Sequence, residues 1–174
     1  MNSEHNKPTM TTPTRPLYMR ALNLPACELR VRDEGGRASI FDALRGKWVA
    51  LTPEEWVRQN FVGYLTRCKG YPAGLIANEA ELRTGDKRVR CDSVVYDNRQ
   101  RPRMIIEYKA PEVALTRRVF DQAVAYNTVL HADWLVVSNG LRHVCCRINY
   151  ADGSWAFVDY IPDYTEIRNH NQSI

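Results

Sequence analysis

The residues best suited to chemistry lie in the apolar segment 104–109, which reads Met-Ile-Ile-Glu-Tyr-Lys. Side chains alternate between the two faces of a strand, so Glu107 and Lys109 would project together with Ile105. Burial of part of an ion pair costs several kcal/mol in desolvation and returns little net stability. A purely structural strand would more easily carry Val or Leu at these positions. We therefore interpret Glu107 and Lys109 as functional residues.

A second carboxylate stands on the strand expected just before this one, at about residues 88–96. Antiparallel pairing through the intervening turn would bring Asp92 close to Glu107. Two convergent carboxylates and a lysine suit the hydrolysis of phosphodiester bonds. Carboxylate oxygens bind Mg²⁺, the bound cation lowers the pKa of a water molecule, and a lysine orients that water and stabilises charge on the phosphate. The backbone carbonyl of Tyr108 would add a further oxygen ligand for the metal.

These residues stand in the order of a known nuclease motif. Asp92, followed after a strand, a turn and a strand by Glu107-x-Lys109, resembles the PD-(D/E)XK nuclease motif. Glu79 upstream matches the additional acid of many members of that superfamily. Cys91 stands where the name of the motif has proline, at a position that supplies no ligand.

A second motif lies downstream. Gln122-x-x-x-Tyr126 places two polar side chains on one face of a helix, and it resembles the Q-x-x-x-Y motif of RecB-like nucleases and type I restriction enzyme R subunits. The resemblance to small stand-alone proteins grouped with the N-terminal region of those R subunits covers about residues 20–164. It rests on three further strings: Leu51-Thr52-Pro53-Glu54-Glu55-Trp56, Lys109-Ala110-Pro111-Glu112 and Asn139-Gly140.

The resemblance implies an α/β fold of the restriction-endonuclease type, with a mixed β-sheet flanked by helices. It also implies a Mg²⁺-dependent endonuclease or exonuclease that acts on DNA, single- or double-stranded, with Mn²⁺ able to replace Mg²⁺. Asp92 and Glu107 would bind the metal with Glu79 in support, Lys109 would act on the attacking water, and Gln122 with Tyr126 would contact DNA or position the site. The alternative is an inactive nuclease-fold module that binds nucleic acid or assembles with a motor or restriction-system subunit. A homodimer is expected by analogy with nucleases that cut both strands.

The charge distribution favours a polyanionic partner. The chain carries 24 Lys and Arg against 20 Asp and Glu, while the window 83–118 alone holds ten basic and five acidic residues. Arg88 and Arg90, on the expected face of Asp92, are interpreted as phosphate contacts, with salt bridges to nearby acids as the alternative.

Simpler interpretations stay open for three other site residues. Glu79 is also compatible with a surface acid at the end of a strand, and Gln122 with a solvated helix residue. Tyr126 is equally compatible with a core aromatic whose hydroxyl is hydrogen-bonded.

Other classes of site lack their motifs. The sequence has neither G-x-x-x-x-G-K-[ST] nor G-x-G-x-x-G, which argues against an NTPase motor and a dinucleotide enzyme. His131 and His143 have no zinc-ligand spacing around them, and the five cysteines are interpreted as small apolar fillers. No stretch approaches the roughly 18 apolar residues of a membrane helix, and residues 1–20 lack the apolar run of a secretory signal, so a cytoplasmic protein is expected.

The 174 residues suit one domain of about 100 to 200 residues. We expect a flexible tail at 1–16, one domain at 17–164 that begins with a small β appendage, and a flexible tail at 165–174. Thr52, Pro53 and Glu55 form the start signal of a helix over 53–68. The remaining elements are expected as a hairpin within 39–51, a helical turn at 73–78, an extended segment at 79–82, strands at 88–96 and 103–109, a helix at 115–131, and strands at 134–137, 142–148 and 155–158.

Overall fold

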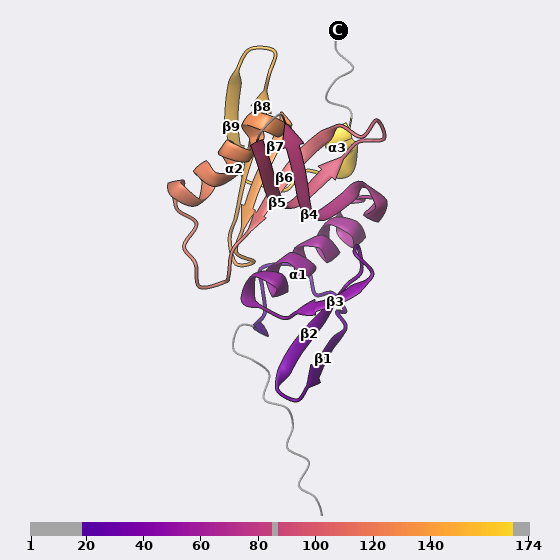
Figure 1. Ribbon diagram of the computed structural model, residues 1–174. Coiled ribbons are helices and arrows are strands. Elements are labelled where there is room, and N and C mark those ends of the chain that lie inside the picture. Colours follow the sequence, from indigo (N-terminus) through magenta and orange to yellow (C-terminus); the bar gives the residue numbers. More distant parts are fainter. Residues whose placement is uncertain (1–18, 85–86, 169–174) are drawn as a thin grey trace, which may run out of the picture.

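The computed structural model describes residues 19–84 and 87–168 (Figure 1). Its main feature is a six-stranded sheet in the order β4-β5-β6-β7-β8-β9. The strands are β4 (Ile76–Thr84), β5 (Lys87–Tyr96), β6 (Pro102–Tyr108), β7 (Trp134–Ser138), β8 (His143–Asn149) and β9 (Ser154–Val158). All neighbours are antiparallel except β6 and β7, which run parallel and are joined by the crossover helix α2 (Arg117–Leu130). This mixed sheet flanked by helices confirms the predicted α/β class.

A separate small sheet precedes the large one. It contains β1 (Val31–Glu34), β2 (Arg37–Asp42) and β3 (Lys47–Ala50), all antiparallel and in that order. The β2–β3 pair is the hairpin that the sequence predicts within 39–51, and β1 is an additional strand. Ile40 of β2 is fully buried against Leu51 and Trp56, so the small sheet packs on the chain around the start of helix α1.

Helix α1 spans Pro53–Cys68, as predicted, because its start is fixed by local chemistry. The Thr52 hydroxyl accepts a hydrogen bond from the Glu55 backbone N–H at 3.1 Å, and Pro53 has no N–H that would need a partner at the first helical position. The helix ends before Gly70, whose φ of 70° a side chain would disfavour.

The two long helices cover opposite faces of the large sheet. Val57, Phe61 and Leu65 of α1 pack with one set of alternating β6 side chains, Met104, Ile106 and Tyr108. Ile105 points to the other face, where Phe120, Tyr126 and Leu130 of α2 lie. Figure 1 shows α1 between the small and the large sheet, so this helix separates the two. The predicted alternation along residues 104–108 is therefore the one observed.

Most element boundaries lie within two residues of the sequence prediction, and two differ by more. The helical turn expected at 73–78 is a 3₁₀ helix at Ala73–Leu75 only, because Ile76, Ala77 and Asn78 already pair with β5. Residues 165–168, expected as the start of the C-terminal tail, belong instead to helix α3 (Tyr164–Arg168), whose Ile167 is completely buried in the core cluster that includes Val57 and Phe61 of α1. The rest of the expected tail, 169–174, lies outside the described residues. The N-terminal tail expected at 1–16 lies outside the described residues.

The five cysteines are free thiols and differ in exposure. Cys91, Cys145 and Cys146 are buried and Cys27 is partly buried, and burial raises the pKa of all four. Cys68, the last residue of α1, is exposed. Among the described helices, none is long and apolar enough to cross a membrane.

Candidate active site

Asp92 and Glu107 come together where β5 and β6 pair. Ser93 lies opposite Ile106 in this antiparallel ladder, and the next residues along the two strands are Asp92 and Glu107. The Tyr108 backbone N–H donates a hydrogen bond to Asp92 Oδ2 at 2.9 Å. Burial raises the pKa of Glu107 to about 7, and the charge of Asp92 adds to this increase while the Lys109 ammonium opposes it. The structure thus brings the two predicted carboxylates into one electrostatic unit.

Four predicted site residues, Glu107, Lys109, Gln122 and Tyr126, are joined by hydrogen bonds. Glu107 is only 4% exposed. Lys109 Nζ and Gln122 Nε2 each donate to Glu107 Oε1 at 2.9 Å. Gln122 Nε2 also lies 2.7 Å from the Tyr126 hydroxyl, which accepts. Burial works against the charge on Lys109, but the Glu107 contact outweighs it, and the pKa of Lys109 is raised. Lys109 is therefore an ammonium at neutral pH and acts through its charge and N–H donors.

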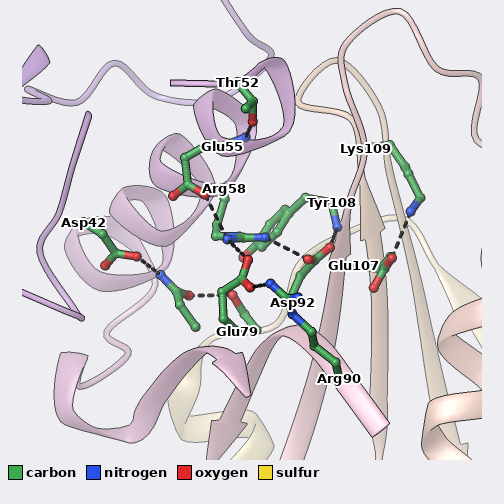
Figure 2. A network of polar contacts seen from close by, with 12 residues as sticks. Asp42, Thr52, Glu55, Arg58, Glu79, Arg90, Asp92, Glu107, Tyr108 and Lys109 are labelled. Carbon is green, nitrogen blue, oxygen red and sulfur yellow. Dashed lines mark hydrogen bonds and ion pairs between the residues drawn. The ribbon is translucent and has the colours of Figure 1, made fainter. Parts of the chain in front are cut away.

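An arginine that the sequence interpretation did not include lies at the centre of the acids (Figure 2). Arg58 of α1 donates from Nη1 to Glu55 Oε2 at 2.9 Å and to Glu79 Oε1 at 2.6 Å, and from Nη2 to Asp92 Oδ1 at 2.8 Å. The residue is only 4% exposed. A signal existed in the sequence, because positions 58, 61 and 65 share one face of a helix and a charged residue therefore interrupts the apolar stripe.

Glu79 reaches the same cluster from β4. Its position falls between the pairs Asn78–Ser93 and Ala80–Cys91, directly across from Asp92, and its φ of 56° is in the left-handed region. Such a conformation costs a residue other than glycine about 1 to 3 kcal/mol. The side chain lies between two arginines, because Glu79 Oε1 binds Arg58 and Oε2 forms an ion pair with Arg90. Glu79 thus combines a left-handed backbone with a carboxylate that is bound through both oxygens.

The remaining predicted residues lie as follows. The Arg90 side chain is 66% exposed and pairs with Glu79, so the salt bridge that the sequence left as an alternative is present. The side chain of Arg88 lies outside the part of the chain that the structure describes. Tyr108 meets Asp92 through its N–H, whereas the sequence interpretation used its carbonyl.

Side chains do not alternate regularly between the two faces of β5, although regular alternation would place Asp92 on the face of Val94 and Tyr96. Val94 and Tyr96 pack in the cluster beside α2, together with Cys91. Strict alternation would place Cys91 and Val94 on opposite faces, so the pattern breaks between them, at Asp92. The break lies directly across from the left-handed Glu79, and Asp92 contacts Arg58 of α1.

The donor atoms fit a hard divalent cation in type. Asp92, Glu107, Glu79 and the Tyr108 carbonyl offer only oxygen, which Mg²⁺ and Mn²⁺ prefer. In this structure Asp92 Oδ1 and Glu79 Oε1 are bound to the Arg58 guanidinium. Within residues 19–84 and 87–168, no group of three or more Asp, Glu, His or Cys side chains is arranged to hold a metal ion. The donor atoms of the site therefore suit a divalent metal ion. In this structure, however, the Arg58 guanidinium neutralises the charge of Asp92 and Glu79.

Among solved structures, the chain is similar to a fragment of a protein described as an HsdR subunit of a type I restriction enzyme from Vibrio vulnificus YJ016, with 17% identity and a TM-score of 0.49. That match covers 67% of this chain and 24% of the fragment, so the chain spans about a quarter of the length of that relative. No curated protein sequence matches the chain.

The family comparison covers more than half of the chain. Residues 53–162, from the start of α1 to just before α3, match the family described as type I restriction enzyme R protein N terminus (HSDR_N). The matched segment contains β4 to β9, α2 and every predicted site residue. The chain therefore belongs to the type I restriction enzyme R protein N-terminal (HSDR_N) family.

Proposed function

We propose that this protein is a metal-dependent nuclease of the PD-(D/E)XK type, which hydrolyses phosphodiester bonds in DNA within a restriction or DNA-processing system. One observation carries the proposal: Asp92, Glu107 and Lys109 meet where β5 and β6 pair, with Gln122 hydrogen-bonded to Glu107. Membership of a family named for the R protein of type I restriction enzymes supports DNA as the substrate.

Each residue of the site has its own role in the proposed reaction. Asp92 and Glu107 would hold Mg²⁺ or Mn²⁺, with Glu79 and the Tyr108 carbonyl in support, and such a cation makes a bound water more acidic and offsets charge on the phosphate. Lys109 keeps its proton, so it orients the attacking water and stabilises negative charge on the phosphate. Gln122 fixes the direction of the Glu107 carboxylate through Oε1.

DNA would be drawn to the site by its basic surroundings. The Arg90 side chain is two-thirds exposed, so it can leave Glu79 for a phosphate. Each phosphate that a protein neutralises releases counterions, so binding should weaken steeply between low and moderate salt. A motor or restriction-system subunit is the proposed partner, and a homodimer would allow both strands to be cut.

A second candidate function follows from Arg58. Because its guanidinium is bound to both Asp92 and Glu79, the same fold would also serve as a module that binds DNA or a partner subunit without cutting. This candidate shares the fold and the family with the first, and it differs only in whether the acids bind a metal.

Cleavage assays separate the two candidates. Supercoiled plasmid, linear duplex and single-stranded DNA are incubated with the full chain in Mg²⁺, Mn²⁺ or EDTA. The Lys109→Ala variant is run beside wild type, and Lys47→Ala, which removes an exposed lysine on β3, is the matched control. A nuclease cuts only with metal, loses activity in Lys109→Ala and keeps it in Lys47→Ala. Salt-sensitive DNA binding without cutting by wild type would favour the second candidate. The absence of both would contradict the nuclease and the DNA-binding form of the second candidate, and would leave a module that binds a partner subunit.

A further inference from the structure

We propose that Arg58 is a built-in competitor of the divalent cation: its guanidinium occupies Asp92 and Glu79, and the metal binds Asp92 only when the guanidinium has left. The inference rests on the metal site of the proposed function, and it adds a regulatory step to that site. It concerns a residue of α1, whereas the proposed metal ligands lie on β4, β5 and β6.

Arg58 is a buried residue that neutralises the acids of the site through defined contacts. Its side chain is 5% exposed, and its two terminal nitrogens bind three carboxylates, those of Glu55, Glu79 and Asp92, at 2.6 to 2.9 Å. These three acids lie close together around one guanidinium, and a nearby positive charge offsets the repulsion between them. Arg58 supplies that cation from within the chain.

Competition follows from the atoms involved. The guanidinium uses Asp92 Oδ1, while Asp92 Oδ2 accepts from the Tyr108 N–H. Each oxygen of Asp92 therefore already accepts one hydrogen bond, and Oδ1 accepts it from a positively charged group. A divalent cation on Asp92 would stand within a few ångströms of the guanidinium, and two positive charges at that distance repel. The Arg58–Asp92 ion pair and a metal on Asp92 are thus alternative states of the site.

Arg58 would still have an acidic partner after a metal displaced it from Asp92. Glu55, three residues before Arg58 on the same helix, lies outside the proposed ligand set and already binds Nη1 at 2.9 Å. Arg58 can therefore leave Asp92 without losing its last acidic partner. The buried Nε atom of Arg58 has no hydrogen-bond partner among the described residues, so the guanidinium is not fully satisfied where it lies.

Metal affinity measured directly tests the proposal. Metal-stripped full-length protein is titrated with MnCl₂ and MgCl₂ by calorimetry, for wild type, Arg58→Met, Arg58→Lys and Asp92→Asn. Arg67→Met is the matched control, since Arg67 is an exposed arginine near the end of the same helix and its guanidinium contacts the Glu28 carbonyl instead of the site. Arg67→Met changes the net charge of the protein by the same amount as Arg58→Met.

Competition predicts that Arg58→Met binds Mn²⁺ about tenfold more tightly than wild type, within the range of about 5- to 150-fold that is typical of coupled sites. Arg58→Lys should be intermediate, because an ammonium keeps the charge but cannot bridge the same acids, and Arg67→Met should match wild type. If Arg58→Met does not fold without metal, Arg58→Lys decides. A purely structural role for Arg58 would lower stability without tightening metal binding.

Two contrary results are distinguishable. If wild type and both Arg58 variants bind Mn²⁺ with equal affinity while Asp92→Asn does not bind it, the competition is overturned and the proposed metal site stands. If no protein in the series binds either cation, the metal site of the proposed function fails, and the competition fails with it.

Discussion

Gln122 on α2 donates a hydrogen bond to Glu107 on β6 at 2.9 Å, and this contact joins the crossover helix to the strand that it follows. The parallel pairing of β6 with β7 requires a long connection, and α2 makes it over the face to which Ile105 points. Gln122 and Tyr126, one turn apart on α2, are therefore hydrogen-bonded to each other, and Gln122 also reaches the carboxylate. The connection that completes the sheet also supports the candidate active site.

Gln122→Ala should lower the free energy of unfolding by about 1 to 2 kcal/mol, because Glu107 is buried and would lose a donor. Urea unfolding at pH 8, where the Glu107 carboxylate is mostly ionised, measures this loss. Asp121→Ala, at the adjacent and exposed position on α2, should change stability by less than about 0.5 kcal/mol. Equal stability of Gln122→Ala and wild type would mean that the contact contributes nothing.

Gly140→Ala should destabilise the protein by about 3 kcal/mol. Its φ of 80° disfavours any side chain, and an added Cβ would lie 2.8 Å from the Leu22 side chain. Gly153 is the matched control, because its φ of 72° is similar and its Cβ would meet nothing within 4 Å, so Gly153→Ala should cost only about 1 to 2 kcal/mol. Thermal unfolding of the two variants compares them, and equal losses would show that the close packing of Leu22 is unimportant.

Ile167→Ala should cost about 2 to 5 kcal/mol, because the side chain is fully buried. Thr165 in the same short helix is exposed, and Thr165→Ala should remain within about 0.5 kcal/mol of wild type. Chemical unfolding of both variants tests whether α3 belongs to the folded unit. A loss below about 1 kcal/mol for Ile167→Ala would place the boundary of the domain before α3.

Asp42 should make stability depend on acid pH. Burial acts to raise the pKa of this carboxyl, but hydrogen bonds from Asn78 and Arg45 outweigh it and lower the pKa below its usual value. The ionised form is therefore favoured in the native state, so its stabilisation is present above about pH 4 and is lost as pH falls through the native pKa.

The Asp42→Asn variant checks this prediction. It should be less stable than wild type by about 3 kcal/mol at pH 7, because Arg45 loses a buried anionic partner. Its stability should also fall less than that of wild type between pH 5 and pH 3 in urea titrations. Parallel pH profiles for the two proteins would assign the acid sensitivity to other carboxyls.

Local chemistry explains what the sequence predicted well. Helix 53–68 is specified by the hydrogen bond between Thr52 and Glu55 and by Pro53, all within one turn. The alternation along 104–108 follows from strand geometry, and the position of Gln122 follows from helical spacing.

The missed features depend on distant partners. Arg58 binds acids 21 and 34 residues away, and nothing near Arg58 in the sequence identifies them. The left-handed Glu79 has no sequence signature, because only glycine and, less often, asparagine or aspartate indicate that conformation. Five residues are too few to show the helical periodicity that would have predicted α3.

Because only one of the five thiols is exposed, a spectroscopic probe can be attached to α1 at Cys68 without removal of any native cysteine. Because burial raises the pKa of the other four thiols, a maleimide probe at neutral pH should attach first to Cys68. Cys68 lies ten residues after Arg58 on one continuous helix, which corresponds to about 15 Å along its axis. A fluorophore there would report whether added Mn²⁺ shifts the helix as a whole or moves only the arginine side chain.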